Sequence, residues 1–356
     1  MDDAEKIKYK DIIHAVYKKD GNILLKPEYY FHWQKYKEKG IFYYYFVGVR
    51  SAGKTYDGIK WLVDEGRGIL VRRTAPEFDI MCDEVHSPFN PLIEVGDLES
   101  GYVKRSKKIY KLYANDEWIA DGVTLNTFAT TRSADYTYFK NIFWDEFIKQ
   151  PDQKEMRAEG SAWLSMIHTI VRNRTDVTVV AAANSNDIYN PVFKELGVIN
   201  HLEKLMNDKK EGSKIYTDYK RHIKIVLFEP CYELKKFLEL TAVHDLTEGT
   251  RYADMAFSNE FIGNDFTDCG YKSIKGYKPI IAIDDFTAWR KKGSNEIYVS
   301  YASCEGVKQY YSKYELDQEN IREHYYTFFR NRYLKHLITF ESYAIKRTFL
   351  DILKLI

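Results

Sequence analysis

A glycine-rich octapeptide directly after a short apolar run is the sequence feature that most constrains the fold. Residues 41–47 are all apolar or aromatic, which is typical of a parallel strand buried on both faces. Gly48–Thr55 then reads Gly-Val-Arg-Ser-Ala-Gly-Lys-Thr and fits the pattern G-x-x-x-x-G-K-[ST] at every fixed position. Helical spacing follows over residues 55–63. Strand, glycine-rich loop and helix in this order predict an α/β domain that binds a nucleotide.

The residue types in this loop suit the chemistry of a triphosphate. Gly48 and Gly53 allow the backbone to curve around phosphate with its N–H groups pointing inward. We expect the Lys54 ammonium to reach the β- and γ-phosphates of ATP, and the Thr55 hydroxyl to bind Mg²⁺. The other loop residues predicted to line the nucleotide site are Arg50, Ser51 and Ala52. For Arg50 the sequence leaves a solvated surface position as an equal alternative.

Short apolar runs alternate with helical patterns along the first 200 residues. Beyond the loop, strands are predicted at 68–73, 141–147 and 177–183, a hairpin at 107–122 and a helix at 158–174. This alternation predicts a parallel central sheet. Residues 1–40 have a mixed pattern that we interpret as mainly helical.

Two adjacent carboxylates end the predicted strand at 141–147. Asp145 is expected to hold the hydrated Mg²⁺, and Glu146 to act as the general base for an attacking water. A glutamate at this position suits an ATP hydrolase, whereas a kinase must exclude water. The alternative is a strand end whose two acids only meet solvent. Asn184, at the end of the next strand, is a candidate sensor of the γ-phosphate or simply the asparagine of a turn.

Several arginines are candidates for stabilising transition-state charge. Arg172 and Arg174 end the predicted helix 158–174, where an arginine could reach the nucleotide of a neighbouring subunit. Both could instead interact with the helix macrodipole. Arg72, which ends the strand 68–73, is a candidate nucleotide contact within the same subunit. Arg132 is a candidate for a loop that faces the centre of a ring. Solvated arginines are the alternative for both.

The combined pattern resembles a known family. The segments FVGVRSAGKTY, ILVRRTAPE, IFWDEFI, VRNR, AAANS and NEFIGN are similar to the DNA-packaging ATPases of small Phi-29-type podophages, over most of residues 40–270. One departure is that Thr74 and Ala75 follow the two arginines of the second strand, where the family can carry a lysine. A second trans contact at that position is therefore not expected here.

The resemblance implies a virus-encoded motor, distantly similar to large terminase subunits. It implies a homo-oligomeric ring, typically a pentamer, that threads double-stranded DNA into a procapsid through the portal. It further implies Arg172 as the arginine that acts in trans, a possible scaffolding RNA as partner, and work in the host cytoplasm at the portal vertex.

The expected fold class is α/β, with three parts. A P-loop NTPase of the ASCE class with a parallel central sheet is expected at 1–200, a helical lid or linker at 201–265, and a small α+β domain at 266–356. IIAIDD, at 280–285, is similar to the first strand of an RNase H-like nuclease, and the family resemblance implies a vestigial domain that no longer cuts DNA. Asp284 or Asp285 would supply one metal ligand, with Asp317 and Asp351 as weaker candidates.

The C-terminal part also carries basic and aromatic residues in one segment. Arg330, Arg332, Lys335 and His336 stand near Tyr325, Tyr326, Phe328 and Phe329. Such interleaving suits nucleic-acid contact, and an amphipathic core helix with a solvated basic face is the alternative.

Composition excludes several classes of protein. A net charge of +1 excludes a simple polycationic nucleic-acid coat, although not a local basic surface. Four separated cysteines give neither a zinc motif nor a disulfide framework. No apolar run approaches 18 residues and the charged N-terminus lacks a signal-peptide stretch, so no membrane partner is expected.

The sequence therefore predicts an ATP-driven translocase of double-stranded viral DNA. Two rival hypotheses stay open. One is a large terminase that also cuts DNA with an active metal-dependent nuclease. The other is a nucleotide-dependent structural switch with negligible turnover, against which Glu146 argues.

Overall fold

The computed structural model describes residues 1–107, 109–131, 134–150, 153, 154, 156, 158–208, 212–250, 253, 257 and 266–355. The chain divides into two compact units. The larger unit contains residues 1–197 and 204–263, and the smaller contains 198–203 and 264–356. Within the described part of the chain, no helix combines the length and the apolarity that a membrane crossing requires.

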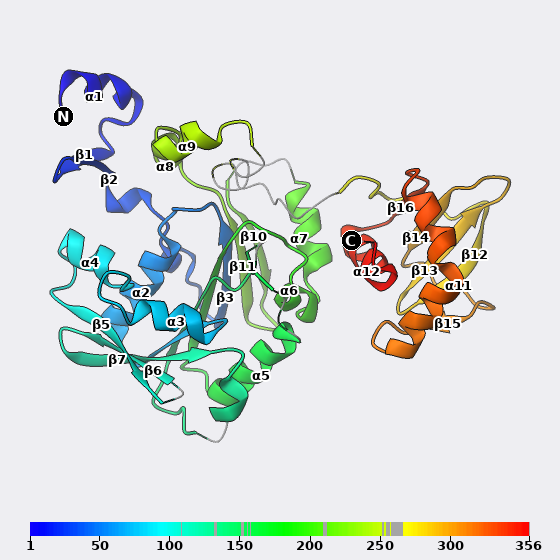
Figure 1. The fold of residues 1–356 in the computed structure, drawn as a ribbon, viewed down its shortest axis with the longest axis horizontal. Helices are drawn as coiled ribbons and strands as arrows, with labels where there is room; N and C mark the ends of the chain where they lie inside the picture. The colour runs from blue at the N-terminus through cyan, green and yellow to red at the C-terminus, as the bar shows by residue number, and fades with distance from the viewer. Residues whose placement is uncertain are drawn as a thin grey trace. The chain divides into compact units, whose positions relative to one another are not determined.

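A nine-stranded mixed sheet forms the centre of the larger unit (Figure 1). Its order is β10-β11-β3-β9-β8-β4-β7-β6-β5. The strands are β3 (Tyr43–Gly48), β4 (Gly68–Arg72), β5 (Gly101–Ser106), β6 (Ile109–Ala114), β7 (Glu117–Thr124), β8 (Asn141–Asp145), β9 (Thr178–Asn184), β10 (Lys214–Asp218) and β11 (Ile223–Phe228). The six strands from β11 to β7 are mutually parallel, whereas β10 at one edge and β6 and β5 at the other pair antiparallel. The predicted parallel sheet is thus correct for the centre, and the sheet as a whole is mixed.

Helices cover both faces of this sheet (Figure 1). The described helices between residues 54 and 247 are α2 (Lys54–Glu65), α3 (Ala75–Met81), α4 (Asn90–Val95), α5 (Glu159–Val171), α6 (Pro191–Glu195), α7 (Ile199–Met206), α8 (Tyr232–Glu239) and α9 (Ala242–Thr247), and residues 199–203 of α7 belong to the smaller unit. Alternate residues of β3 enter different cores. Tyr44 and Phe46 belong to the cluster that contains α2, whereas the Tyr45 hydroxyl accepts a hydrogen bond of 3.0 Å from the Trp163 indole of α5. A strand buried on both faces reads as a continuous apolar run, which is why the sequence predicts β3 well.

The first forty residues are not mainly helical, so this prediction is wrong. A short helix α1 (Asp3–Lys8) and a 3₁₀ turn at 10–12 precede the hairpin of β1 (Val16–Lys19) and β2 (Asn22–Leu25), and two more 3₁₀ turns follow it at 27–29 and 33–36. The turn at Asp20 and Gly21, both with positive φ, closes the hairpin in the manner of a two-residue loop. The sequences of the two strands, VYKK and NILL, do not alternate regularly between apolar and polar residues, so the pattern typical of a strand is not visible.

The predicted helical linker at 201–265 is wrong over 214–228, where β10 and β11 extend the large sheet. Strand β11 is buried throughout and pairs with β3. Lys224 interrupts the apolar run of β11 in the sequence. Its ammonium can nevertheless be buried, because it is bound by the Glu38 carboxylate and by the Tyr36 carbonyl at 3.1 Å.

The smaller unit is a five-stranded sheet with order β15-β12-β13-β14-β16 and two described helices. Its elements are β12 (Tyr277–Ile283), β13 (Phe286–Lys291), β14 (Ile297–Ser300), β15 (Gln309–Tyr310), α11 (Glu315–Tyr333), β16 (Ile338–Phe340) and α12 (Tyr343–Leu353). Phe329 of α11 and Phe349 of α12 meet edge-to-face at 4.9 Å in its core. Mixed α/β architecture is thus present in both units.

Candidate functional site

A polar cavity of about 390 Å³ lies where β3 passes through the glycine-rich loop into α2. Its walls come from the loop and from the carboxyl ends of β8 and β9, the edge where α/β sheets bind ligands. The lining residues are Arg50, Ser51, Ala52, Gly53, Lys54, Thr55, Tyr56, Asp145, Glu146, Ala183 and Asn184. The structure therefore brings the predicted loop, the two predicted acids and Asn184 to one place.

The loop has the backbone conformation that its glycines allow. Gly53 has φ of 88° and is the residue before α2, so an L side chain there would be strained. A Cβ on Gly48 would approach the Phe228 side chain and carbonyl at 3.0 Å. Both glycines are thus needed by the conformation and packing of the loop.

Lys54 is buried under the loop. Its ammonium donates to the Gly48 carbonyl at 3.0 Å and to the Val49 carbonyl. Burial lowers the pKa of Lys54 to about 7, and the nearby Asp145 charge partly opposes this effect. A phosphate group in the cavity would restore the charged form by replacing neutral carbonyl partners with an anion.

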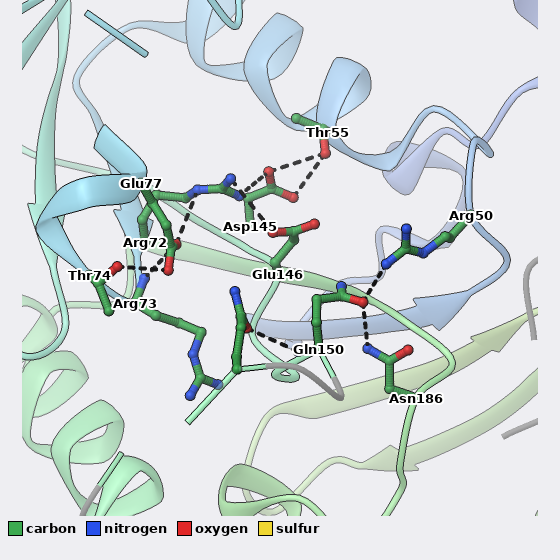
Figure 2. A network of polar contacts seen from close by, with 11 residues as sticks. Arg50, Thr55, Arg72, Arg73, Thr74, Glu77, Asp145, Glu146, Gln150 and Asn186 are labelled. Carbon is green, nitrogen blue, oxygen red and sulfur yellow. Dashed lines mark hydrogen bonds and ion pairs between the residues drawn. The ribbon is translucent and has the colours of Figure 1, made fainter. Parts of the chain in front are cut away.

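Thr55 and Asp145 form the pair predicted to organise Mg²⁺ (Figure 2). The Thr55 hydroxyl hydrogen lies between the two carboxylate oxygens, with Oγ1 at 3.0 and 3.1 Å from them. Asp145 is buried, and its carboxylate also accepts a hydrogen bond of 2.6 Å from the Arg72 guanidinium. A hydroxyl and a buried carboxylate in contact are hard oxygen ligands of the type that Mg²⁺ prefers.

Glu146 lies beside this pair. Its φ of 56° is left-handed, so the chain turns sharply directly after β8 and the carboxylate reaches the cavity. The Arg72 guanidinium lies 3.6 Å from the Glu146 carboxylate. Burial, followed by the charge of Asp145, raises the pKa of Glu146. A raised pKa brings a carboxylate closer to the basicity that a general base requires.

Comparison with known proteins identifies the family. The model of the podovirus DNA encapsidation protein (Gp16) matches residues 25–349. The chain belongs to this family. A DNA packaging protein of Bacillus phage PZA is 24% identical over 75% of this chain and 77% of its own length. One of Bacillus phage phi29 is 25% identical over 61% of each chain, so the match spans less than two thirds of that relative.

Two solved structures share the fold of this chain. The Phi-28 gp11 DNA packaging motor is 17% identical, with a TM-score of 0.60 over 93% of this chain and 99% of that chain. The bacteriophage Phi-29 genome packaging motor assembly is 16% identical, with a TM-score of 0.60 over 92% and 99%. These likenesses establish the fold.

The structure places the predicted trans arginines outside the cavity. Arg172, in the left-handed region at the end of α5, is exposed, and its Nε donates to the Thr169 carbonyl at 3.3 Å. Arg174 donates to the carbonyls of Thr137 and Phe139, each at 2.7 Å. Arg174 thus joins loops of its own chain, whereas Arg172 points to the surface. Arg132 lies outside the described residues.

The sequence did not predict two polar contacts, of which Figure 2 shows the one around Gln150. The Gln150 side-chain oxygen accepts from Arg50 and, at 3.2 Å, from the Asn186 amide. Arg73 and Glu159 form a buried ion pair of 2.6 Å between the end of β4 and the start of α5. Two adjacent arginines at the end of a buried strand indicate that a buried acid pairs with one of them, but the sequence does not show which acid, because Glu159 is far along the chain.

Two of the C-terminal candidate acids accept hydrogen bonds from adjacent backbone N–H groups of the smaller unit. Asp284 accepts from the Ser312 N–H at 2.9 Å, and Asp317 from the Tyr311 N–H at 2.8 Å. Among the residues with described positions, no three His, Cys, Asp or Glu side chains are grouped to hold a metal ion. In α11 the Arg332 guanidinium stacks on Phe328 at 3.6 Å, and Phe329 is in the core.

Proposed function

We propose that this protein is an ATPase that drives double-stranded DNA into a procapsid through the portal. The observation that carries the proposal is the meeting of Lys54, Thr55, Asp145 and Glu146 around one cavity. Strand β9 lies between the loop strand β3 and the acid strand β8. This order, with a glutamate after the acid, supports the finer assignment to the ASCE class of P-loop NTPases.

The roles of the residues follow from their positions. Lys54 would neutralise the β- and γ-phosphates, and the N–H groups of residues 51–54 would surround them. Thr55 and Asp145 would hold Mg²⁺, which supplies Lewis-acid stabilisation of phosphate charge. Glu146 would accept the proton of the attacking water, and Asn184 would contact the γ-phosphate.

Arg72 would keep the two adjacent acids from repelling each other. It lies within 2.6 Å of Asp145 and 3.6 Å of Glu146. The guanidinium charge offsets the repulsion between two adjacent carboxylates in a poorly solvated site. Arg72 would therefore position the metal-binding acid and the general base.

We further propose a homo-oligomeric ring, in which Arg172 of one subunit completes the site of the next. Its exposure at the end of α5 suits this role better than the internal contacts of Arg174. The relatives named packaging motors support a ring. We propose a pentamer and a scaffolding RNA only because the family resemblance implies them. We expect the ring to act in the host cytoplasm, at the portal vertex.

We propose an ATPase domain of residues 1–200 joined by β10 and β11, a remaining linker that ends near 265, and a vestigial RNase H-like domain at 266–356. Contact with the DNA backbone would be independent of sequence, so DNA-stimulated turnover should weaken with salt. The rival hypothesis is an active metal-dependent nuclease. Such a nuclease needs several metal ligands in one place, and the described residues contain no such group.

Substitutions in the cavity test the nucleotide site. Lys54→Ala should lose both ATP binding and hydrolysis. Glu146→Gln should keep binding and lose hydrolysis by about 10²–10⁴-fold. Glu84→Gln, at an exposed acid away from the cavity, is the matched control and should behave as wild type. Unchanged hydrolysis in Glu146→Gln would refute the assigned base, and absent hydrolysis in an assembled wild-type ring would favour the structural switch.

Mixing two inactive variants tests the trans arginine. Arg172→Ala retains Glu146, and Glu146→Gln retains Arg172, so a mixed ring contains some complete sites. We expect partial recovery of hydrolysis on mixing. No recovery, or full activity of Arg172→Ala alone, would contradict action in trans.

A further inference from the structure

The Arg72 guanidinium lies among three carboxylates at the end of β4 (Figure 2). Its Nη1 lies 2.6 Å from Asp145, its Nη2 lies 3.6 Å from Glu146, and its Nε lies 3.6 Å from Glu77. The Arg72 side chain is only 12% exposed, so these acids supply most of the polar surroundings of its charge. The three nitrogens of one guanidinium thus face three different acids.

Glu77 is held in place by the chain that leads into α3. Its Oε1 accepts from the Thr74 hydroxyl at 2.9 Å, and its Oε2 accepts from the Arg73 N–H at 3.3 Å. Because α3 begins at Ala75, Glu77 is its third residue, from which a glutamate or glutamine side chain can reach back to the chain before the helix. Both oxygens of this carboxylate are therefore fixed by neighbours in the sequence, and Oε2 also faces the Nε of Arg72.

We propose that Glu77 is a positioning residue for ATP hydrolysis, which anchors Arg72 so that the guanidinium keeps Asp145 and Glu146 in place. The inference rests on the proposed ATPase and adds to it a residue outside the phosphate cavity. Asp145 and Glu146 line that cavity, whereas Arg72 and Glu77 do not. Glu77 thus acts through Arg72 and not on the nucleotide.

The shape of the guanidinium explains how an anchor on one side affects the other. The group is planar and rigid, so holding its Nε beside Glu77 fixes the directions in which both Nη groups point. The contact with Glu146, at 3.6 Å, is looser than the contact with Asp145, at 2.6 Å. Without the charge of Glu77 we expect the guanidinium to move toward Asp145 and to leave Glu146 less restrained. A misplacement of about 1 Å at a reacting group can cost about 10²-fold in rate.

Glu77→Gln tests the anchor while it keeps the start of α3. Glutamine serves as glutamate does at the third position of a helix, so the variant loses the charge beside Arg72 but retains an oxygen for the Thr74 or Arg73 hydrogen bond. We expect kcat for ATP hydrolysis to fall by about tenfold, with KM for ATP and the melting temperature close to those of wild type. Glu315→Gln, at an exposed acid in the first turn of α11, is the matched control and should behave as wild type.

Two further variants separate positioning from a structural role. Thr74→Val removes one of the two donors that hold Glu77 and keeps the charge, so kcat should fall in the same direction by a smaller factor. Glu77→Gln should have no further effect on kcat in an Arg72→Ala background, because a residue that acts through Arg72 has nothing left to position. An additional loss of about tenfold in the double variant would show an independent route and overturn the proposal.

Steady-state phosphate release at a series of ATP concentrations decides between the outcomes. Wild-type kcat in both Glu77→Gln and Thr74→Val would refute the positioning role and leave the proposed ATPase intact. A raised KM with unchanged kcat would assign Glu77 to nucleotide binding and would also refute it. Absence of hydrolysis in the assembled wild-type ring would instead overturn the proposed function, and the positioning role with it.

Discussion

The buried Arg73–Glu159 ion pair makes the sharpest quantitative prediction for the fold around the site. The guanidinium and the carboxylate lie 2.6 Å apart, and the side chains are 4% and 0% exposed. Removing Glu159 takes the partner carboxylate from the buried Arg73 guanidinium, and breaking a buried ion pair in this way costs about 3–5 kcal/mol in measured cases. Glu159→Ala should therefore lower the free energy of unfolding of the larger unit by about this amount.

The loss should be visible as a lower melting temperature. For a unit of this size, 1 kcal/mol corresponds to roughly 2–4 °C. Differential scanning fluorimetry of Glu159→Ala should then show a fall of roughly 6–20 °C. Urea unfolding followed by circular dichroism should give the same order of variants.

Two further variants separate the ion pair from general damage. The double change Arg73→Met with Glu159→Leu removes both charges and should recover most of the lost stability, because the burial of unpaired charge disappears. Asp176→Ala breaks an exposed pair with Lys140, at 2.9 Å with 40% and 49% exposure, and should cost about 0–1 kcal/mol. A Glu159→Ala loss no greater than that of Asp176→Ala would refute the reasoning, as would a double variant less stable than both single ones.

Three other perturbations follow from the same structure. Because burial lowers the pKa of Lys54 to about 7, that lysine is mainly neutral at pH 8, and MgATP binding at this pH should take up a proton. Calorimetry in buffers of different ionisation enthalpy measures this uptake; Lys54→Met should abolish it, and a wild-type value near zero would contradict the lowered pKa. The hydrogen bond to Asp57, followed by that to the Pro27 carbonyl, raises the pKa of His32, so its stabilising contribution is complete below the unfolded value of about 6.5 and is lost as pH rises through the folded pKa. The melting temperature of wild type minus that of His32→Gln should accordingly shrink from pH 5.5 to 8.5, and growth over that range would show the opposite linkage. A Cβ on Gly58 would lie 2.1 Å from the Phe143 ring, so Gly58→Ala should destabilise the contact of α2 with β8 by about 1–3 kcal/mol, whereas Gly270→Ala, in open space, should be neutral in the same melting assay.

The sequence predicts the elements that position the phosphate cavity because each carries a local signal. Strands β3, β8 and β9 are buried on both faces and read as apolar runs. The loop pattern between β3 and α2 depends on glycine conformation and on one lysine, both of which are visible in eight consecutive residues. Parallel strands then place Asp145 and Asn184 at the same edge of the sheet.

Features that depend on partners far along the chain were not predictable in this way. Nothing near Arg73 in the sequence indicates Glu159, and nothing near the hairpin of β1 and β2 indicates that it packs beside Gly53. The sequence predicts a helical linker where β11 lies, since Lys224 interrupts the apolar pattern of this strand. Only the fold brings Glu38 to Lys224 as its partner. Contacts between charged residues far apart in the chain were therefore harder to predict from the sequence than local secondary structure was.

The most direct test of the central claim is the steady-state rate of phosphate release with and without double-stranded DNA, in wild type and in Glu146→Gln. An ATP-driven DNA motor predicts release that DNA stimulates in wild type and that the substitution abolishes in both conditions. It also predicts that stimulation declines as salt rises, because the DNA backbone is the contact. Release that is abolished by the substitution but indifferent to DNA, in rings assembled on a portal, would contradict coupling of hydrolysis to DNA movement.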